Sequence, residues 1–331
     1  MIGVFASHAR SVTNHFRDSF ANRALFRRLA GWAVSALPHE PTLAQRLGFD
    51  STKRVLIVNA DDFGLSLEQN RAIMDGMHNG IVTSASVMVP CSGFKQVCDY
   101  ARSEPRMDLG VHLTLNSEWR NERWRPVLAP PLVESLIDLE GYFHQHYSEV
   151  VSNSNAYEVK SELRAQIERA LSEGIDVTHL DSHMCVLHGH RAELNDVYLS
   201  LAREYSLPIR AASTILMHWH GFSSIPARAN RIGLFHPDHF GVLSRIRPSR
   251  YATFWRILLH TLPAGVTEIS CHLSYGGAEL PDDPDEVLRR EAEFRFLRSV
   301  EAHDLIKQEG IQLVGYRLLR DAMREQRIKG E

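Results

Sequence analysis

The sequence predicts an α/β protein in which about seven strand–helix units form a closed or nearly closed barrel. From Arg54 onward, short apolar runs alternate with segments whose apolar residues recur at helical spacing. Such alternation is typical of a parallel sheet, because each crossover between parallel strands usually contains a helix. The 331 residues are enough to bury one large core of this type. An open, doubly wound sheet is the structural alternative.

The predicted strands are the short apolar runs at 55–60, 81–90, 108–115, 176–181, 208–212, 265–271 and 311–316. The predicted helices are amphipathic and cover 66–78, 94–103, 157–173, 192–205 and 285–304. Two long segments, 116–156 and 213–250, interrupt the alternation, and irregular segments of this length in a compact domain are usually functional. Both carry aromatic side chains that suit either stacking on sugar rings or the packing of a lid.

The composition is that of a soluble globular protein, with 44% hydrophobic and 23% charged residues. The net charge of -3 gives no case for nucleic-acid binding. The four cysteines are scattered without paired spacing, so we expect no disulfide framework and no cysteine-rich zinc site. Reduced cysteines are typical of a cytoplasmic protein.

The first 50 residues differ in character from the rest and predict a basic amphipathic helical extension, followed by a barrel domain over residues 51–325. Arginines outnumber acidic residues in this segment, and apolar side chains recur at helical spacing. The helix packs either on the domain or on a second subunit of a homodimer. Alternatively, residues 1–48 contact an anionic membrane on its cytoplasmic face, or the segment is a transit peptide.

Acidic and histidine side chains stand at or just beyond the carboxyl ends of several predicted strands. In a parallel barrel these ends lie on one face, where catalytic residues are found. The residues are Asp61, Asp62, His112, His179, Asp181, His183 and His272. Taken singly, each of these residues could have a purely structural role, such as a histidine packed in the core or an acidic residue in a turn. Their joint placement at strand ends favours a metal site.

One carboxylate and two neutral imidazoles form a ligand set that leaves open positions for water and substrate. Asp62, His112 and His183 satisfy that count. Asp61, next in the chain but not a ligand, is then a candidate general base for a water molecule on the metal. This ligand set accepts one divalent ion, with Zn, Mg, Mn, Co and Ni as the alternatives.

Four segments in chain order resemble the YdjC-like family of carbohydrate deacetylases. They are NADDFG at 59–64, GIVTSASVM at 80–88, GVHLTL at 110–115 and THLDSH at 178–183. The resemblance extends from about Arg54 to about Arg320, and the ordered combination is much more specific than any one segment.

The resemblance implies a distorted, incomplete TIM-like (β/α) barrel and metal-dependent removal of the acetyl group from an N-acetylated amino sugar. The sugar is an N-acetylglucosamine-type mono- or oligosaccharide, a polysaccharide fragment or a lipid-linked hexosamine. Carried over onto this chain, the resemblance makes Asp61 the base and Asp62, His112 and His183 the metal ligands. His272 stands in Cys-His-Leu where family members often have Cys-His-Pro, and it is a candidate general acid for the leaving amine.

Other polar residues are candidates for supporting roles at the site. His179 and Asp181 are expected either to support His183 through hydrogen bonds or to be structural. Arg210, at the end of the strand predicted at 208–212, either orients the base or binds substrate.

Asp238 and His239 lie in the second long irregular segment, and we expect them to contact substrate. Two rival functions remain open at this point. One is another metallohydrolase, such as a phosphoesterase, on the same barrel. The other is a catalytically silent sugar-binding homologue.

Overall fold

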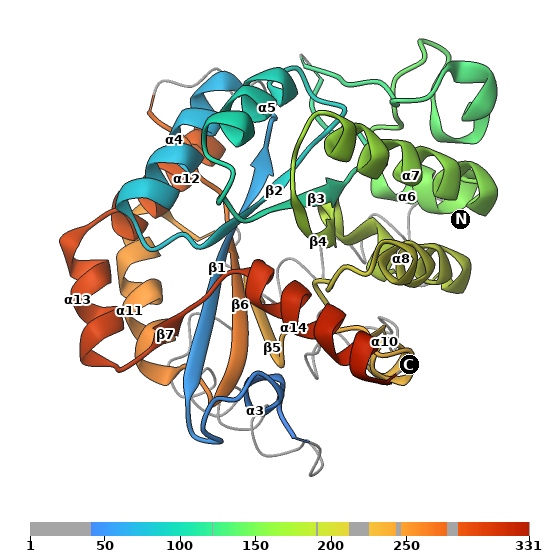
Figure 1. Ribbon diagram of the computed structural model, residues 1–331. Helices are drawn as coiled ribbons and strands as arrows, with labels where there is room; N and C mark the ends of the chain where they lie inside the picture. The colour runs from blue at the N-terminus through green and yellow to red at the C-terminus, as the bar shows by residue number, and fades with distance from the viewer. Residues whose placement is uncertain are drawn as a thin grey trace, which may run out of the picture. The chain divides into compact units, whose positions relative to one another are not determined.

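Seven parallel strands form one curled sheet with helices packed around it (Figure 1). The computed structural model describes residues 41–120, 122–189, 191–211, 225–242, 246–276 and 284–330. The strand order is β4-β3-β2-β1-β6-β5, and β7 pairs with β1 outside this path. The strands are β1 Arg54–Phe63, β2 Ser84–Val87, β3 Leu109–Leu113, β4 Val177–Ser182, β5 His239–Val242, β6 Gly265–Cys271 and β7 Gln312–Leu313. The predicted incomplete α/β barrel is confirmed.

The predicted helices form, and the structure adds others to them. The α-helices are α3 Leu43–Arg46, α4 Leu67–Asn79, α5 Phe94–Ser103, α6 Tyr147–Asn153, α7 Ala156–Ser172, α8 Ala192–Tyr205, α10 Ile225–Arg231, α11 Tyr251–Thr261, α12 Pro284–Leu297, α13 Val300–Gln308 and α14 Tyr316–Gly330. The single helix predicted over 285–304 is instead two helices. The chain breaks between them because Ser299 caps α13 by accepting a hydrogen bond from the Ala302 N–H.

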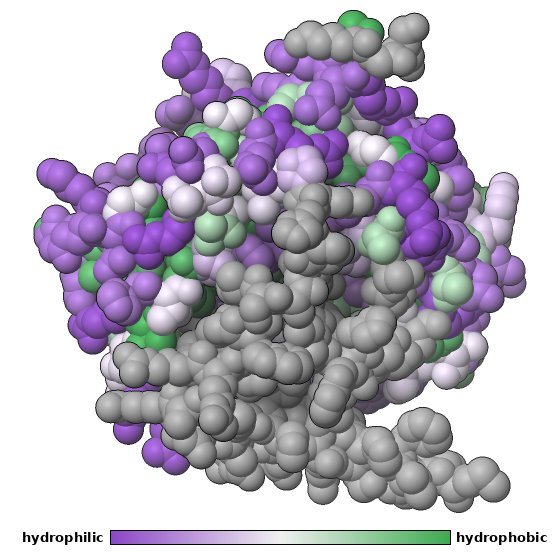
Figure 2. All heavy atoms as spheres, turned by 90° about the horizontal axis from the view of Figure 1, so that it is seen from below, coloured by the Kyte–Doolittle hydropathy of each residue, from purple (hydrophilic) through white to green (hydrophobic). Residues whose placement is uncertain are grey.

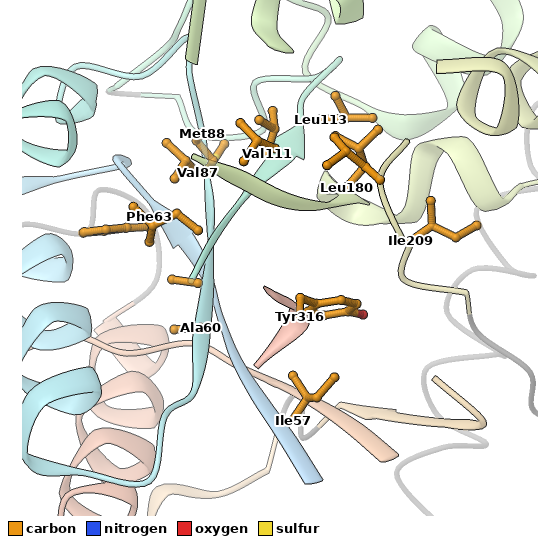
Figure 3. Packing of buried hydrophobic residues seen from close by; sticks show 14 of the residues in the cluster. Ile57, Ala60, Phe63, Val87, Met88, Val111, Leu113, Leu180, Ile209 and Tyr316 are labelled. Atoms are coloured by element: carbon orange, nitrogen blue, oxygen red, sulfur yellow. The ribbon is translucent and has the colours of Figure 1, made fainter. Parts of the chain in front are cut away.

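Polar and apolar side chains alternate along the strands and divide the sheet into two faces. Strand pairing places Asn59 beside Ser84, and His112 beside Asp181. These side chains share the inner face, since adjacent residues in register point the same way. Apolar residues between them pack on the opposite face, against the flanking helices. Figure 3 shows part of this apolar set, including Ala60, Val87, Val111, Leu113 and Leu180.

The strand predicted at 208–212 is reduced to a single bridge, Leu180↔Ile209, beside β4. The Arg210 N–H donates to the Leu180 carbonyl oxygen, while the Ile209 N–H donates to the Phe235 carbonyl oxygen. The Leu180 N–H also donates to the Pro208 carbonyl oxygen, so residues 208–210 lie along β4 over this short stretch. The short segment nevertheless delivers the Arg210 side chain to the inner face of the sheet.

His179 is fully buried in the interior of the barrel. Its imidazole stacks on the Tyr316 ring, with ring centroids 3.9 Å apart, and burial lowers the pKa of His179 to about 3. On the other side, the ring lies where a side chain at Gly110 would be, so only glycine fits there. The Tyr316 hydroxyl donates to Glu268 Oε2 at 2.6 Å.

Helix α7 holds the long segment that follows β3. Gln166 binds both the N–H and the carbonyl oxygen of Thr114, and the Glu162 carboxylate accepts the N–H groups of Val127 and Leu128. These buried contacts recur one turn apart on one side of the helix. They fix a segment predicted to be irregular, and this segment contributes Glu118 to the site.

Residues 1–40, which contain most of the predicted extension, lie outside the described residues. Near the start of the described residues, the Leu43 N–H donates to Asp238 Oδ1 at 2.8 Å. This hydrogen bond joins α3 to the amino end of the sheet. No helix among the described residues has the length and apolar character needed to cross a membrane. Figure 2 shows mainly hydrophilic side chains on the described part of the lower face.

We expect Tyr316→Phe to lower the free energy of unfolding by about 1–3 kcal/mol, because it leaves an oxygen of the buried Glu268 carboxylate without its donor. Chemical denaturation followed by circular dichroism measures the loss. Tyr157→Phe is the matched control: this ring is 79% exposed, so the change should stay within about 0.5 kcal/mol. Equal effects of the two substitutions would contradict the role given to the Tyr316 hydroxyl.

Candidate metal centre and active site

Two adjacent carboxylates end β1 and reach the same side of the sheet. Neighbouring residues of a strand normally point to opposite faces, but Asp62 has a φ of 64°, in the left-handed region. The pairing of β1 with β2 also shifts register between Ala60 and Phe63. As a result, Asp61 and Asp62 each have an oxygen near His112, and both are almost fully buried.

Asp62, His112 and His183 form the candidate metal centre. Asp62 Oδ1 lies 3.6 Å from His112 Nε2 and 3.5 Å from His183 Nδ1, and the three ligand atoms lie within 4.8 Å of one another. Those separations are too long for good hydrogen bonds. Two ligands bound to one ion at about 2.1 Å with a tetrahedral angle lie about 3.4 Å apart. The donor set therefore fits a single divalent ion.

Carboxylates on the far side of both imidazoles orient them towards Asp62. His112 Nδ1 lies 2.7 Å from Asp181 Oδ1 and 3.2 Å from Ser86 Oγ. His183 Nε2 lies 3.0 Å from Glu118 Oε2. A ring nitrogen that donates its proton to a carboxylate leaves the other nitrogen free to bind a metal, which is the usual arrangement around metal-ligating histidines.

The electrostatics of the centre favour a cation. Burial alone would raise the pKa of Asp62, but Arg290 and His183 outweigh it and hold that pKa well below its usual value. Burial would lower the pKa of His183, but Glu118 and Asp62 raise it to about 10. In the metal-free protein His183 therefore carries a proton beside Asp62. A metal ion would replace that proton.

Asp61 belongs to a second buried cluster, centred on Arg210. The Arg210 guanidinium donates two hydrogen bonds to Asp61, from Nη1 to Oδ2 at 2.8 Å and from Nη2 to Oδ1 at 2.6 Å. It also lies 3.0 Å from Asp181 Oδ2, and its Nε donates to Glu268 Oε1 at 2.9 Å. Asn59 Nδ2 donates to Asp61 Oδ1 at 2.9 Å. These contacts fix the orientation of Asp61.

His272 follows β6 and is held by its main chain. Its N–H donates to Glu293 Oε2 at 3.0 Å, and Trp255 Nε1 donates to Glu293 Oε1 at 3.1 Å. Burial lowers the pKa of His272 and outweighs the opposing effect of Asp62, so the imidazole is neutral at neutral pH in the metal-free protein. Burial also raises the pKa of Glu293, to about 8, despite the two hydrogen bonds.

Asp181 and His179, both candidates for supporting His183, have different partners in the structure. Asp181 supports His112 rather than His183, and His179 lies deeper in the barrel against Tyr316. The His183 imidazole instead contacts Glu118, and His183 begins the 3₁₀ turn that follows β4.

Asp238 and His239, expected to contact substrate, lie at the opposite end of the sheet from the centre. Asp238 Oδ2 accepts the N–H of Val266 near the start of β6, and His239 Nε2 lies 3.1 Å from the Ala264 carbonyl oxygen. Both residues therefore lie away from the candidate metal centre, because they precede and begin β5, whereas the centre forms at the carboxyl ends of the strands.

Three residues at the site were absent from the sequence prediction. They are Glu118, Arg290 and Glu293, which contact His183, Asp62 and His272 respectively. Glu118 follows β3 within the segment marked as functional, so its location was indicated although its role was not. The other two lie on the predicted charged helix, whose polar residues gave no sign that one face enters the site.

Fold and site together define an α/β-barrel protein with a candidate metal centre at the carboxyl ends of its strands. The family model described as YdjC-like protein matches residues 55–308, and the chain belongs to that family. The resemblance of the four sequence segments is therefore confirmed.

Related proteins match almost along their whole length. A carbohydrate deacetylase from Thermoanaerobacter pseudethanolicus is 28% identical over 275 residues, covering 81% of this chain and 100% of the relative. One from Enterococcus faecalis is 31% identical over 275 residues, covering 81% and 99%. The crystal structure of a proposed cellobiose-phosphate cleavage protein from Enterococcus faecalis matches with a TM-score of 0.68 and 30% identity, covering 80% and 98%.

The raised pKa of Glu293 predicts a specific pH dependence of stability. Between its ordinary value of 4.5 and about 8, the native state holds a proton that the unfolded state releases, so this residue makes stability fall as pH rises. We expect the unfolding free energy of wild type minus that of Glu293→Gln to fall from pH 4.5 to 8 and then level off. Urea denaturation at several pH values measures it. Glu134→Gln, at an exposed position, should give a flat difference; a flat difference for Glu293→Gln as well would contradict the prediction.

Proposed function

We propose that this protein is a metal-dependent deacetylase that removes the acetyl group from N-acetylated amino sugars. The observation that carries the proposal is the arrangement of three ligand atoms from Asp62, His112 and His183, each imidazole backed by its own carboxylate. The family supports the reaction class, since the two matched relatives from Thermoanaerobacter and Enterococcus are carbohydrate deacetylases.

Asp62, His112 and His183 would hold one divalent ion. When bound, such an ion polarises an acetyl carbonyl group and lowers the pKa of water at an open coordination position. Asp61 is the proposed general base, because it lies beside the ligand set and its carboxylate is fixed by the Arg210 guanidinium. Oδ1 of Asp61 accepts from both Arg210 and Asn59, whereas Oδ2 accepts from Arg210 alone and keeps a lone pair for a water proton.

His272 is the proposed general acid for the departing sugar amine. His272 directly follows Cys271, which pairs with Ala60 just before Asp61, and the Glu293 carboxylate accepts a hydrogen bond from the His272 N–H. Because burial lowers the pKa of His272, the imidazole starts neutral, and the proton that Asp61 takes from the water has to reach His272 before His272 protonates the leaving amine. Asp61 and His272 then act as a base and acid pair on β1 and β6, which are neighbours in the sheet.

Aromatic rings beside the ligands suit a sugar substrate. Trp124 lies edge-on to His183, with centroids 6.1 Å apart, and Trp119 lies edge-on to Trp124 at 6.2 Å. Trp119 is only partly buried, so part of its ring is available for stacking on a pyranose. Soluble chito-oligosaccharides and a lipid-linked N-acetylhexosamine both offer such a ring. The basic residues 1–48 are the proposed membrane contact in the second case.

We expect acetate release from at least one member of a panel of N-acetylated mono-, oligo- and lipid-linked sugars, assayed with Zn, Mg, Mn, Co and Ni in turn. Asp61→Asn should reduce kcat by at least about 100-fold, since general base catalysis typically contributes that much. Metal content should stay at the wild-type level because the three ligands remain. Release is measured by an acetate-coupled assay, and metal by elemental analysis.

The matched control is His239→Gln, which changes a histidine at the opposite end of the sheet and should leave kcat within about twofold. Wild-type turnover in Asp61→Asn, with metal retained, would contradict the role of Asp61. No acetate release from any sugar with any of the five metals would contradict the proposed function itself.

A further inference from the structure

One face of α12 enters the site and contacts it at two points. Arg290 Nη2 donates to Asp62 Oδ2 at 2.8 Å, and one turn later Glu293 accepts the His272 N–H. Arg290 is only 6% exposed, unlike Arg295 on the same helix, whose side chain is 75% exposed. A buried arginine needs several hydrogen-bond and ionic partners to offset the cost of removing its charge from water.

The Arg290 guanidinium is held on three sides by three different elements. Nε donates to Glu286 Oε1 at 3.0 Å, one turn earlier on α12, and Nη1 donates to Gln69 Oε1 at 3.1 Å on α4. Nη2 is the group that reaches Asp62 on β1. The planar fork therefore has a fixed orientation before any ligand binds.

Because Arg290 binds Asp62, the two carboxylate oxygens of Asp62 have different partners. Oδ2 receives the Arg290 hydrogen bond, while Oδ1 faces the nitrogens of His112 and His183. A carboxylate without such a partner can rotate and present either oxygen, or both, to a cation. Since the guanidinium binds the far oxygen, its charge also stays on the side of Asp62 away from the two imidazoles.

The local charge balance permits a cation next to this arginine. The buried and half-buried carboxylates around the centre outnumber the two arginines, Arg210 and Arg290. These carboxylates are Asp61, Asp62, Glu118, Asp181 and Glu268. A net negative charge therefore remains after both guanidinium groups are counted, and a divalent ion would offset it.

We propose that Arg290 is a positioning residue that makes Asp62 a single-oxygen ligand of the divalent cation. The inference rests on the proposed metal-dependent function and adds a residue on a helix that contributes no ligand of its own. It predicts that losing the Arg290 fork weakens metal binding even though all three ligands remain.

The test measures metal binding directly in the full chain. Mn²⁺ and Co²⁺ affinities are determined by competition with a chelator for wild type, Arg290→Gln, Arg290→Lys and Arg295→Gln. We expect Arg290→Gln to weaken binding by at least about tenfold, as loss of a partner behind a metal ligand usually does. Arg290→Lys should lie in between because it keeps the charge without the fork. Arg295→Gln should bind like wild type.

A second readout separates positioning from general stability. The visible spectrum of bound Co²⁺ reports its coordination, so Arg290→Gln should change that spectrum even at saturating metal, whereas Arg295→Gln should not. Glu286→Gln removes one of the anchors of Arg290 and keeps its charge. It should weaken binding by less than Arg290→Gln, and together with Arg290→Lys it carries the test if Arg290→Gln does not fold.

Two negative results have different meanings. If wild type binds the ions and the folded Arg290 and Glu286 variants bind them with the same affinity and spectrum, the positioning role is wrong and the proposed function stands. If wild type binds neither Mn²⁺ nor Co²⁺, this inference is wrong, and the metal-dependent function is wrong as well only if none of the five metals supports acetate release.

Discussion

The structure of the site depends on one buried arginine, Arg210, which forms ion pairs with carboxylates from three strands. Its guanidinium contacts Asp61 on β1, Asp181 on β4 and Glu268 on β6. Three carboxylates on the inner face of a sheet would repel one another without a shared cation. Arg210 holds them together, and Tyr316 completes the partners of Glu268. Such a cluster is better at specifying geometry than at adding stability.

The geometry set by Arg210 extends outward to the candidate ligands. Asp181, held by Arg210, in turn orients His112, whose free nitrogen faces Asp62. On the other side, Arg290 holds the second oxygen of Asp62. Two guanidinium groups thus hold the carboxylates on either side of the ligand atoms and leave the space between those atoms for a cation. Asp61, the proposed base, and Asp62, the proposed ligand, are adjacent in sequence but have separate arginine partners and so separate environments.

Much of the fold could be predicted from the sequence because the strands carry strong local signals. The apolar run before Asp61 predicts β1, and the alternation in His179–Leu180–Asp181 predicts one polar face on β4. The ligand candidates could also be named, since each lies on or directly beyond a strand. Alternate polar residues on β2 and β3, such as Ser86 and His112, belong to the same face, and their pattern could have indicated a polar barrel interior.

The remaining features depend on contacts between distant parts of the chain. The signal for Arg290 is only its place on a charged helix, which is equally typical of a solvent-exposed face. Glu118 lies in a segment without periodicity, whose path is fixed by Glu162 and Gln166 on α7. The sequence did not indicate that Asp238 lies at the amino end of the sheet, because the short strand β5 that follows it was not predicted.

The central claim is that Asp62 Oδ1, His112 Nε2 and His183 Nδ1 bind one divalent ion. A crystal structure of the protein grown with Mn²⁺ or Zn²⁺, with data collected at the metal absorption edge, tests it most directly. We expect a single strong anomalous peak within about 2.0–2.2 Å of all three atoms, as for Zn ligands, with Arg290 still on Asp62 Oδ2. A peak at another set of residues, or none near these three atoms at saturating metal, would contradict the account.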